Sequence, residues 1–189
     1  MIYLEGLTNM RQMTPSTMVA GISSKILQIR KESIKQSLSD LNTIGHRQDY
    51  VATIDGVMYY DDSRAENVNA TWFTFENIIK PVIWIAGGND SETDFKDLRR
   101  VAKKKVKALI CLGDDRTSSL KKAFQKDIKD IYSASSLEDA VKMASLLAQE
   151  DDIVLFSPAC KSSDDNETYI ERGNLFTETV KQLENEHRQ

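Results

Sequence analysis

Apolar residues recur along the chain with two different spacings, and these spacings predict its strands and helices. Two β-forming runs, 50–54 and 57–60, flank Asp55-Gly56, a pair typical of a two-residue hairpin turn. Further continuous apolar runs predict strands at 82–86, 108–112, 128–132 and 153–156, and helical spacing predicts helices at 72–79, 94–105, 116–125, 136–148 and 169–183. Buried strands that alternate with amphipathic helices indicate an α/β fold, with a doubly wound, mostly parallel sheet covered on both faces.

The N-terminal part of the chain follows a different pattern. One helix is predicted at 14–30, with a proline near its first position, and a second short helix fits 31–41. Neither helix has a strand of its own to cover. We therefore interpret 1–44 as the helical remnant of a preceding domain and 45–189 as the α/β domain, which ends in a polar, fraying tail at 184–189.

The composition excludes several kinds of site. The 189 residues carry 25 basic and 29 acidic side chains, a net charge of −4, which leaves no basic stripe for nucleic acid. None of the eight glycines is followed by lysine and no two are spaced Gly-x-Gly, so the sequence has neither a P-loop nor a dinucleotide fingerprint. Two histidines and two cysteines are too scattered for a zinc site, and the apolar runs are too short to cross a membrane. We expect a cytoplasmic protein.

Polar or glycine-rich loops follow four of the predicted strands, at 61–67, 87–91, 113–115 and 157–162. Ligands of an open α/β sheet bind beyond the carboxyl ends of its strands, where helix N-termini also favour anions. We therefore expect these loops to converge on one ligand-binding edge. Taken singly, each loop is also typical of ordinary turns and helix caps.

The motifs in and around these loops resemble the C-terminal domain of the Mur ligases. They are His46-Arg47, Asp62-Ser63-x-Ala65-x-Asn67, the segment 83–88, Ser157-Pro158-Ala159-Cys160-x-Ser162, and Tyr169-x-x-Arg172-Gly173-x-x-Phe176. Within the family, the chain is most similar to the enzymes that add D-glutamate to a peptidoglycan precursor. The resemblance implies a Rossmann-like domain and identifies the first 44 residues with the last helices of the family's central ATPase domain.

The resemblance also implies a mechanism and roles for individual residues. The family transfers the γ-phosphate of ATP, with Mg²⁺, to a carboxylate, and the amine of the incoming amino acid attacks the acyl phosphate. By match, Arg47, Asp62 and Asn67 would contact the nucleotide, and Arg64, Ser162 and Tyr169 would bind D-glutamate. The match assigns no catalytic residue and no metal ligand to this chain.

Four positions depart from the family pattern. Glu66, Ser91 and Glu92 stand where the family has threonine, lysine and glycine, and the family lysine at position 64 is an arginine. One lost cation and two added anions disfavour binding of a dianionic amino acid, because close like charges repel. Lys161 is a partly compensating cation.

Three hypotheses about function follow. In the first, the chain is the truncated C-terminal part of a D-glutamate-adding ligase; alone it would bind ATP and D-glutamate weakly at best and show no turnover, and a missing ligase half or a full-length ligase would be its partner. In the second, it is a stand-alone binding or regulatory module. In the third, it is a decayed copy without activity, still folded because its core is intact.

Five further predictions concern residues outside these assignments. His46 fits a functional and a structural role equally well, whereas Cys160 is expected to be a packed residue rather than a nucleophile. Trp72 and Trp84 are expected in the core. The lysine run 103–105 is interpreted as the solvated end of a helix.

Overall fold

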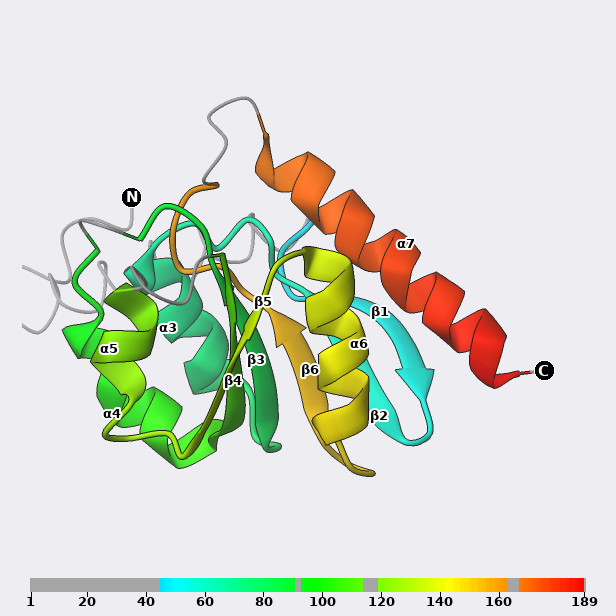
Figure 1. Ribbon diagram of the computed structural model, residues 1–189, viewed down its shortest axis with the longest axis horizontal. Helices are drawn as coiled ribbons and strands as arrows, with labels where there is room; N and C mark the ends of the chain where they lie inside the picture. Colours follow the sequence, from blue (N-terminus) through cyan, green and yellow to red (C-terminus); the bar gives the residue numbers. More distant parts are fainter. Residues whose placement is uncertain (1–44, 91–92, 114–118, 163–166, 189) are drawn as a thin grey trace, which may run out of the picture. The chain divides into compact units, whose positions relative to one another are not determined.

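A computed structural model describes residues 45–90, 93–113, 119–162 and 167–188 (Figure 1). These residues belong to one compact unit that extends from Gly45 to Gln189. The helices predicted within 1–44 lie outside the described residues, so the assignment of this segment to a preceding domain stays a prediction.

After an initial hairpin, helices and strands alternate along the described chain. They are β1 (Asp49–Ile54), β2 (Val57–Asp61), α3 (Val68–Asn77), β3 (Val82–Gly87), α4 (Lys96–Lys105), β4 (Val106–Leu112), α5 (Ser119–Phe124), β5 (Asp130–Ala134), α6 (Leu137–Leu147), β6 (Ile153–Phe156) and α7 (Tyr169–His187). Every strand and helix predicted from Asp49 onward is present. The bounds of most differ by a few residues from those that the sequence pattern predicted.

The strands form a single sheet in the order β1-β2-β6-β3-β4-β5. Only the β1–β2 pairing is antiparallel among the described strands, and the remaining pairs are parallel. Asp55 and Gly56 close the hairpin with φ angles of 49° and 78°, the left-handed conformation that a tight two-residue turn requires. The predicted doubly wound, mostly parallel sheet with an N-terminal hairpin is confirmed.

Side chains of the central strands alternate between two hydrophobic clusters, one on each face of the sheet. Ile83 and Ile85 of β3 pack beneath α6 and α7, whereas Trp84 packs beneath α3, α4 and α5 (Figure 1). The Trp84 ring meets Phe75 and Phe124 edge-on, with centroids 5.1 and 5.3 Å away. Burial on both faces explains why these strands are apolar throughout.

Two local predictions are wrong, and a third is wrong for one of its three residues. Trp72 is 42% exposed on α3, so only Trp84 of the two tryptophans lies in the core. Lys103 and Lys104 are exposed at the end of α4, as predicted. Lys105 is not, because its Nζ donates hydrogen bonds to the carbonyl oxygens of Phe75 and Ile78 at the end of α3. The tail from 184 does not fray, since α7 continues to His187.

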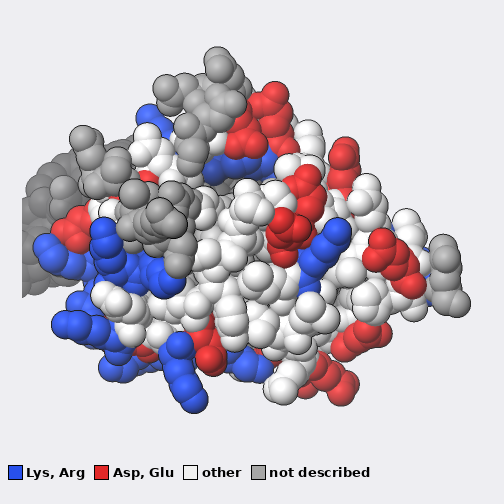
Figure 2. Space-filling view, in the orientation of Figure 1, with Lys and Arg blue, Asp and Glu red and all other residues white. Residues whose placement is uncertain are grey.

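Charged side chains are distributed unevenly on the surface. Figure 2 shows Lys and Arg gathered over α4 and α5, whereas Asp and Glu border α7. Asp127 partly balances the positive side, since it pairs with Arg99 at 2.6 Å and with Lys103 at 3.4 Å. The net charge of −4 therefore conceals a molecule with two differently charged sides.

The direction of the chain reverses at the carboxyl edge between β3 and β6. The chain leaves β3 for α4 on one face of the sheet and leaves β6 for α7 on the other. Gly87 N donates to Pro158 O at 3.1 Å, and Asn89 N donates to Lys161 O at 2.9 Å. The expected convergence of the loops after β3 and β6 is confirmed, and such a switch point is where doubly wound sheets bind ligands.

Candidate functional site

Asp62 lies just beyond β2 and is fully buried. Its Oδ2 accepts hydrogen bonds from the hydroxyls of Thr74 and Ser157, both at 2.7 Å, while its buried Oδ1 has no partner among the described residues. Burial raises the pKa of this carboxyl to about 7, although the two hydroxyls and the positive charge of Arg47 act in the opposite direction. The group is therefore poised to change protonation near neutral pH.

The neighbouring Asp61 binds a histidine instead of hydroxyls. Its Oδ2 lies 2.6 Å from Nδ1 of His46, and its Oδ1 accepts a hydrogen bond from the Ser63 amide. Gly173 of α7 packs directly against this group, because a Cβ there would lie 2.2 Å from His46 Nδ1 and 2.6 Å from Asp61 Oδ2. The glycine allows α7 to cover the histidine–aspartate pair, and the pair fixes the loop that carries Arg47.

The arginines assigned by resemblance to the nucleotide and to D-glutamate lie on aromatic rings. The Arg47 guanidinium is 5.7 Å from the ring centre of Phe73 on α3, and that of Arg64 is 5.3 Å from the ring centre of Tyr169. Arg64 and Tyr169, both assigned to D-glutamate, are therefore in contact. Asn67, assigned to the nucleotide, caps α3 by accepting a hydrogen bond from the Ala70 amide.

Glu66 is paired with a buried arginine. Its Oε1 lies 2.8 Å from Nη2 of Arg172, whose side chain is 5% exposed, against 30% for Glu66. This pair joins the β2–α3 loop to the first turn of α7. The negative charge of Glu66 therefore has a direct counter-ion in Arg172. The sequence analysis did not identify this counter-ion.

Two cavities flank the switch point. One, of about 390 Å³, lies among Gly88, the start of α6 at Ser136, Ser162 and Arg172. The other, of about 620 Å³, is lined by Glu66, by asparagines of the β2–α3 and β3–α4 loops, and by Lys161. The Glu66–Arg172 pair thus has one member in the wall of each cavity.

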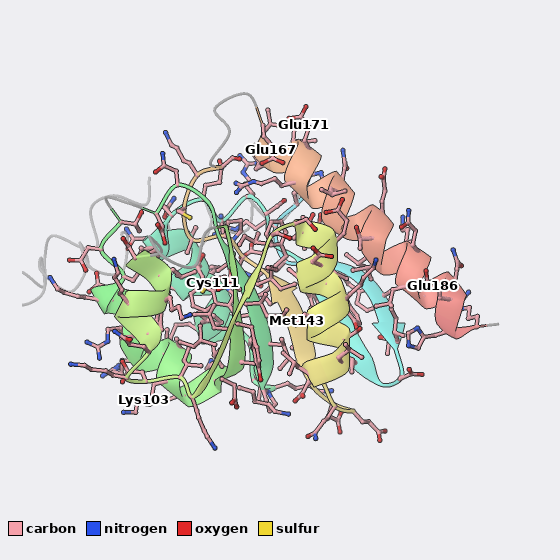
Figure 3. All side chains as sticks on the ribbon, in the orientation of Figure 1. Lys103, Cys111, Met143, Glu167, Glu171 and Glu186 are labelled. Carbon is pink, nitrogen blue, oxygen red and sulfur yellow. The ribbon has the colours of Figure 1, made fainter. Side chains whose placement is uncertain are left out.

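The remaining predicted residues divide between this crevice and undescribed segments. Ser162 borders the smaller cavity, and its hydroxyl donates a hydrogen bond to Glu167, which Figure 3 shows beside the start of α7. Cys160 is buried, and burial raises the pKa of its thiol to about 12, which confirms it as a packed residue. Ser91 and Glu92 lie outside the described residues, so the charge argument at these positions stays a prediction.

Sequence reasoning missed Arg172 as a site residue. The residue was visible in the Tyr169-x-x-Arg172-Gly173 motif, but its position on the buried face of a helix was the signal that distinguished it. Arginine is seldom fully buried unless it is paired, so such a position indicates a partner or a ligand. Ser157 was part of a family motif but received no role, and Thr74 carried no comparable signal, because hydroxyl residues are common at helix surfaces.

Comparison with known proteins gives the family of the chain. The family sequence profile described as "Mur ligase, glutamate ligase domain" matches residues 46–160. UDP-N-acetylmuramoylalanine–D-glutamate ligase of Christiangramia forsetii is 39% identical over 168 residues, which cover 89% of this chain and 38% of that protein. The protein of the same name from Lactobacillus delbrueckii subsp. bulgaricus is 38% identical over 183 residues, which cover 97% of this chain and 39% of that protein.

A solved structure aligns with the chain at lower identity. The MurF ligase of Thermotoga maritima in complex with ADP aligns at 14% identity and a TM-score of 0.49, covering 74% of this chain and 32% of that one. The chain spans less than two fifths of the length of the two curated relatives above. No helix in the described part of the chain is both long and apolar enough to cross a membrane.

Proposed function

This chain belongs to the Mur ligase family through its glutamate ligase domain, and from this premise we propose that it presents D-glutamate for ATP-dependent ligation to UDP-N-acetylmuramoyl-L-alanine. In this role the domain binds the incoming amino acid and closes over an ATPase domain. Amide formation would then belong to the complete ligase in the cytoplasm, and peptidoglycan synthesis would use its product.

The observation that carries the proposal is the gathering of the motif residues at one edge of the sheet. Arg64 contacts Tyr169, and Ser162 lines the cavity that also contains Arg172. These side chains come from the β2–α3 loop, the segment after β6 and the first turn of α7, which are far apart in the sequence and meet through the fold. Convergence of polar groups at a switch point is what a small-molecule site requires.

ATP and Mg²⁺ enter the proposal through the family. When bound, ATP supplies the phosphoryl group that activates a carboxylate. Arg47 beside the buried Asp62 is suited to an anionic ligand, whereas no three metal-ligating side chains gather within the described residues. The sequence contains no P-loop, so we propose that residues outside these 189 cradle the phosphates and hold the metal.

The paired state of Glu66 supports an amino-acid site more than a decayed one. An unpaired carboxylate beside the site would repel D-glutamate, but the contact with Arg172 reduces its net effect.

A chimeric ligase tests the proposal. Residues 45–189 would replace the matching segment of the Christiangramia forsetii enzyme, and ADP release would be measured with the UDP-linked substrate and D-glutamate. We expect ADP release that requires D-glutamate and is lost on Arg47→Ala but retained on Arg100→Ala, an exposed change on α4. The isolated 189-residue chain should release no ADP.

The alternatives predict different results. If the chimera folds without turnover, calorimetry of the isolated 189-residue chain decides between the alternatives. Binding of D-glutamate or ATP by that chain would indicate a binding or regulatory module. Binding of neither would indicate a decayed copy and would overturn the proposal.

A further inference from the structure

Arg172 has an unused hydrogen-bond donor in a buried place. Its Nη2 donates to Glu66, while its Nε is buried and has no partner in the described part of the chain. The residue as a whole is 4% exposed and lines the 390 Å³ cavity. A buried N–H without an acceptor is costly, and protein structures seldom retain one without a reason.

The two nitrogens concerned lie on the same edge of the guanidinium. A carboxylate that grips this edge places one oxygen on Nε and the other on Nη2, which is the strong bidentate arrangement. Glu66 occupies only the Nη2 position. The observed contact is therefore half of a bidentate pair, and the Nε half has no acceptor among the described residues.

We propose that Arg172 binds a carboxylate of the incoming amino acid through Nε and Nη2, and that Glu66 is an internal competitor for the same guanidinium. The chemical class of the ligand, a dicarboxylic amino acid, rests on the proposed function. The competition itself rests on the geometry of Arg172, Glu66 and the cavity.

The cavity matches this ligand in size and in part of its polarity. Its 390 Å³ accommodates one small dicarboxylate, and Ser162 contributes a hydroxyl to its wall. The N-terminus of α6, an 11-residue helix, also borders it at Ser136 and Leu137. The amides there carry partial positive charge, which adds to the attraction that Arg172 exerts on an anion.

Two further carboxylates oppose a negative ligand in this cavity. Glu138 of α6 and Glu167 before α7 both line it, and Glu167 accepts a hydrogen bond from Ser162. Together with Glu66 they make the site weak in its observed state. Removing the charge of Glu66 should therefore strengthen carboxylate binding more than removing that of Glu138, because Glu66 contacts the guanidinium.

Nuclear magnetic resonance of the 189-residue chain tests the competition directly, since the Nε–H group of Arg172 gives its own signal. Wild type, Glu66→Gln and Glu138→Gln would each be titrated with glutarate and with D-glutamate. We expect glutarate to move the Arg172 Nε–H signal saturably and about tenfold more tightly in Glu66→Gln than in wild type. Glu138→Gln, the control in the same cavity, should change the affinity less than about threefold.

Each outcome decides between the two proposals. Equal affinities of wild type and Glu66→Gln, an Nε–H signal that stays unmoved at saturation, or no saturable glutarate binding would overturn the role of Arg172. If glutarate moves the signal and D-glutamate does not bind, the carboxylate site stands and the proposed substrate fails. If D-glutamate binds without moving the signal, the substrate stands and the competition fails.

Discussion

Asp62 and Arg172 are both buried at the carboxyl edge, one on the α3 side and the other on the α7 side, and they are stabilised in opposite ways. Neutral hydroxyls of Thr74 and Ser157 hold Asp62, whereas a carboxylate, that of Glu66, holds Arg172. Hydroxyl donors do not cancel a charge, so burial still favours the protonated form of Asp62. Arg172 keeps its charge because guanidinium does not lose its proton in proteins.

The difference assigns different tasks to the two sides of the edge. The α3 side carries a carboxyl whose charge changes near neutral pH, next to Arg47. The α7 side carries a permanent cation whose availability depends on a movable carboxylate. pH therefore acts on the first side, and competition between carboxylates acts on the second.

The largest effect on stability should come from Gly88→Ala, which disturbs the carboxyl edge that the Asp62 side and the Arg172 side share. Gly88 has φ of +147°, and a Cβ there would lie 2.2 Å from the carbonyl oxygen of Lys161. Strain and overlap together should lower the free energy of unfolding by about 4 kcal/mol. Urea unfolding measures this loss, and Gly113→Ala is the control, since it also has positive φ but no heavy atom within 4 Å of its Cβ.

Asp62→Asn should separate the two sides by pH. Because the pKa of Asp62 is raised to about 7, the folded protein keeps a proton on this carboxyl at pH values where the unfolded chain has released it. Asp62 therefore lowers the free energy of unfolding as the pH rises from about 4, near the ordinary pKa of aspartate, to about 7. The amide cannot titrate. Between about pH 4 and pH 8 the variant should gain on the order of 3 kcal/mol relative to wild type.

Unfolding measured across this pH range checks the effect of Asp62→Asn. Asp97→Asn, an exposed change on α4, should follow wild type at every pH. A difference between Asp62→Asn and wild type that stays constant with pH would show that the carboxyl is not held in its protonated form.

Much of the fold was predictable because the apolar positions of the sequence pattern are also the buried positions of the structure. The strand 82–86 and the Asp55-Gly56 turn are found where the pattern placed them, since buried parallel strands are apolar throughout and few pairs form such a turn. Trp72 and Lys105 were misassigned for tertiary reasons. The Trp72 position on α3 faces outward, and Lys105 caps the end of a helix that is distant in sequence.

The location of the site was predictable from the sequence, but the contacts between its side chains were not. Loop composition and the family motifs located Arg64, Ser162 and Tyr169 at one edge, and the structure brings Arg64 and Tyr169 into contact. The Glu66–Arg172 pair spans 106 positions, so no local pattern could reveal it. Glu66, which departs from a family motif, was therefore interpreted without its counter-ion Arg172.

Arg172→Met should have the next largest effect on stability. Its removal leaves Glu66 without a counter-ion, but Glu66 is already 30% exposed and can turn toward water. We therefore expect a loss of about 2 kcal/mol, less than is usual when a fully buried pair is broken. Thermal and urea unfolding measure it, and Glu66→Gln should lose less, because the amide oxygen still accepts from Arg172. A greater loss of stability in Glu66→Gln than in Arg172→Met would contradict this expectation. It would show that burial of Glu66 is more costly than burial of Arg172.

Thr74→Val should have the smallest effect and tests why Asp62 is the titrating side. The change removes one of the two hydroxyls on Asp62 Oδ2 and leaves a side chain of the same shape. We expect a loss of about 1 kcal/mol that grows toward alkaline pH, because the ionised carboxylate needs the donor more than the neutral acid does.

The titration of Asp62 should also move upward in Thr74→Val, and carboxyl carbon resonances measure this directly. Thr179→Val is the matched control: its hydroxyl donates to Leu175 O within α7, so it should cost stability without moving the Asp62 titration. An unchanged titration in Thr74→Val would mean that burial alone sets the proton affinity. In that case the hydroxyls would orient the carboxyl, and the contrast with Arg172 would lie in burial and not in the kind of partner.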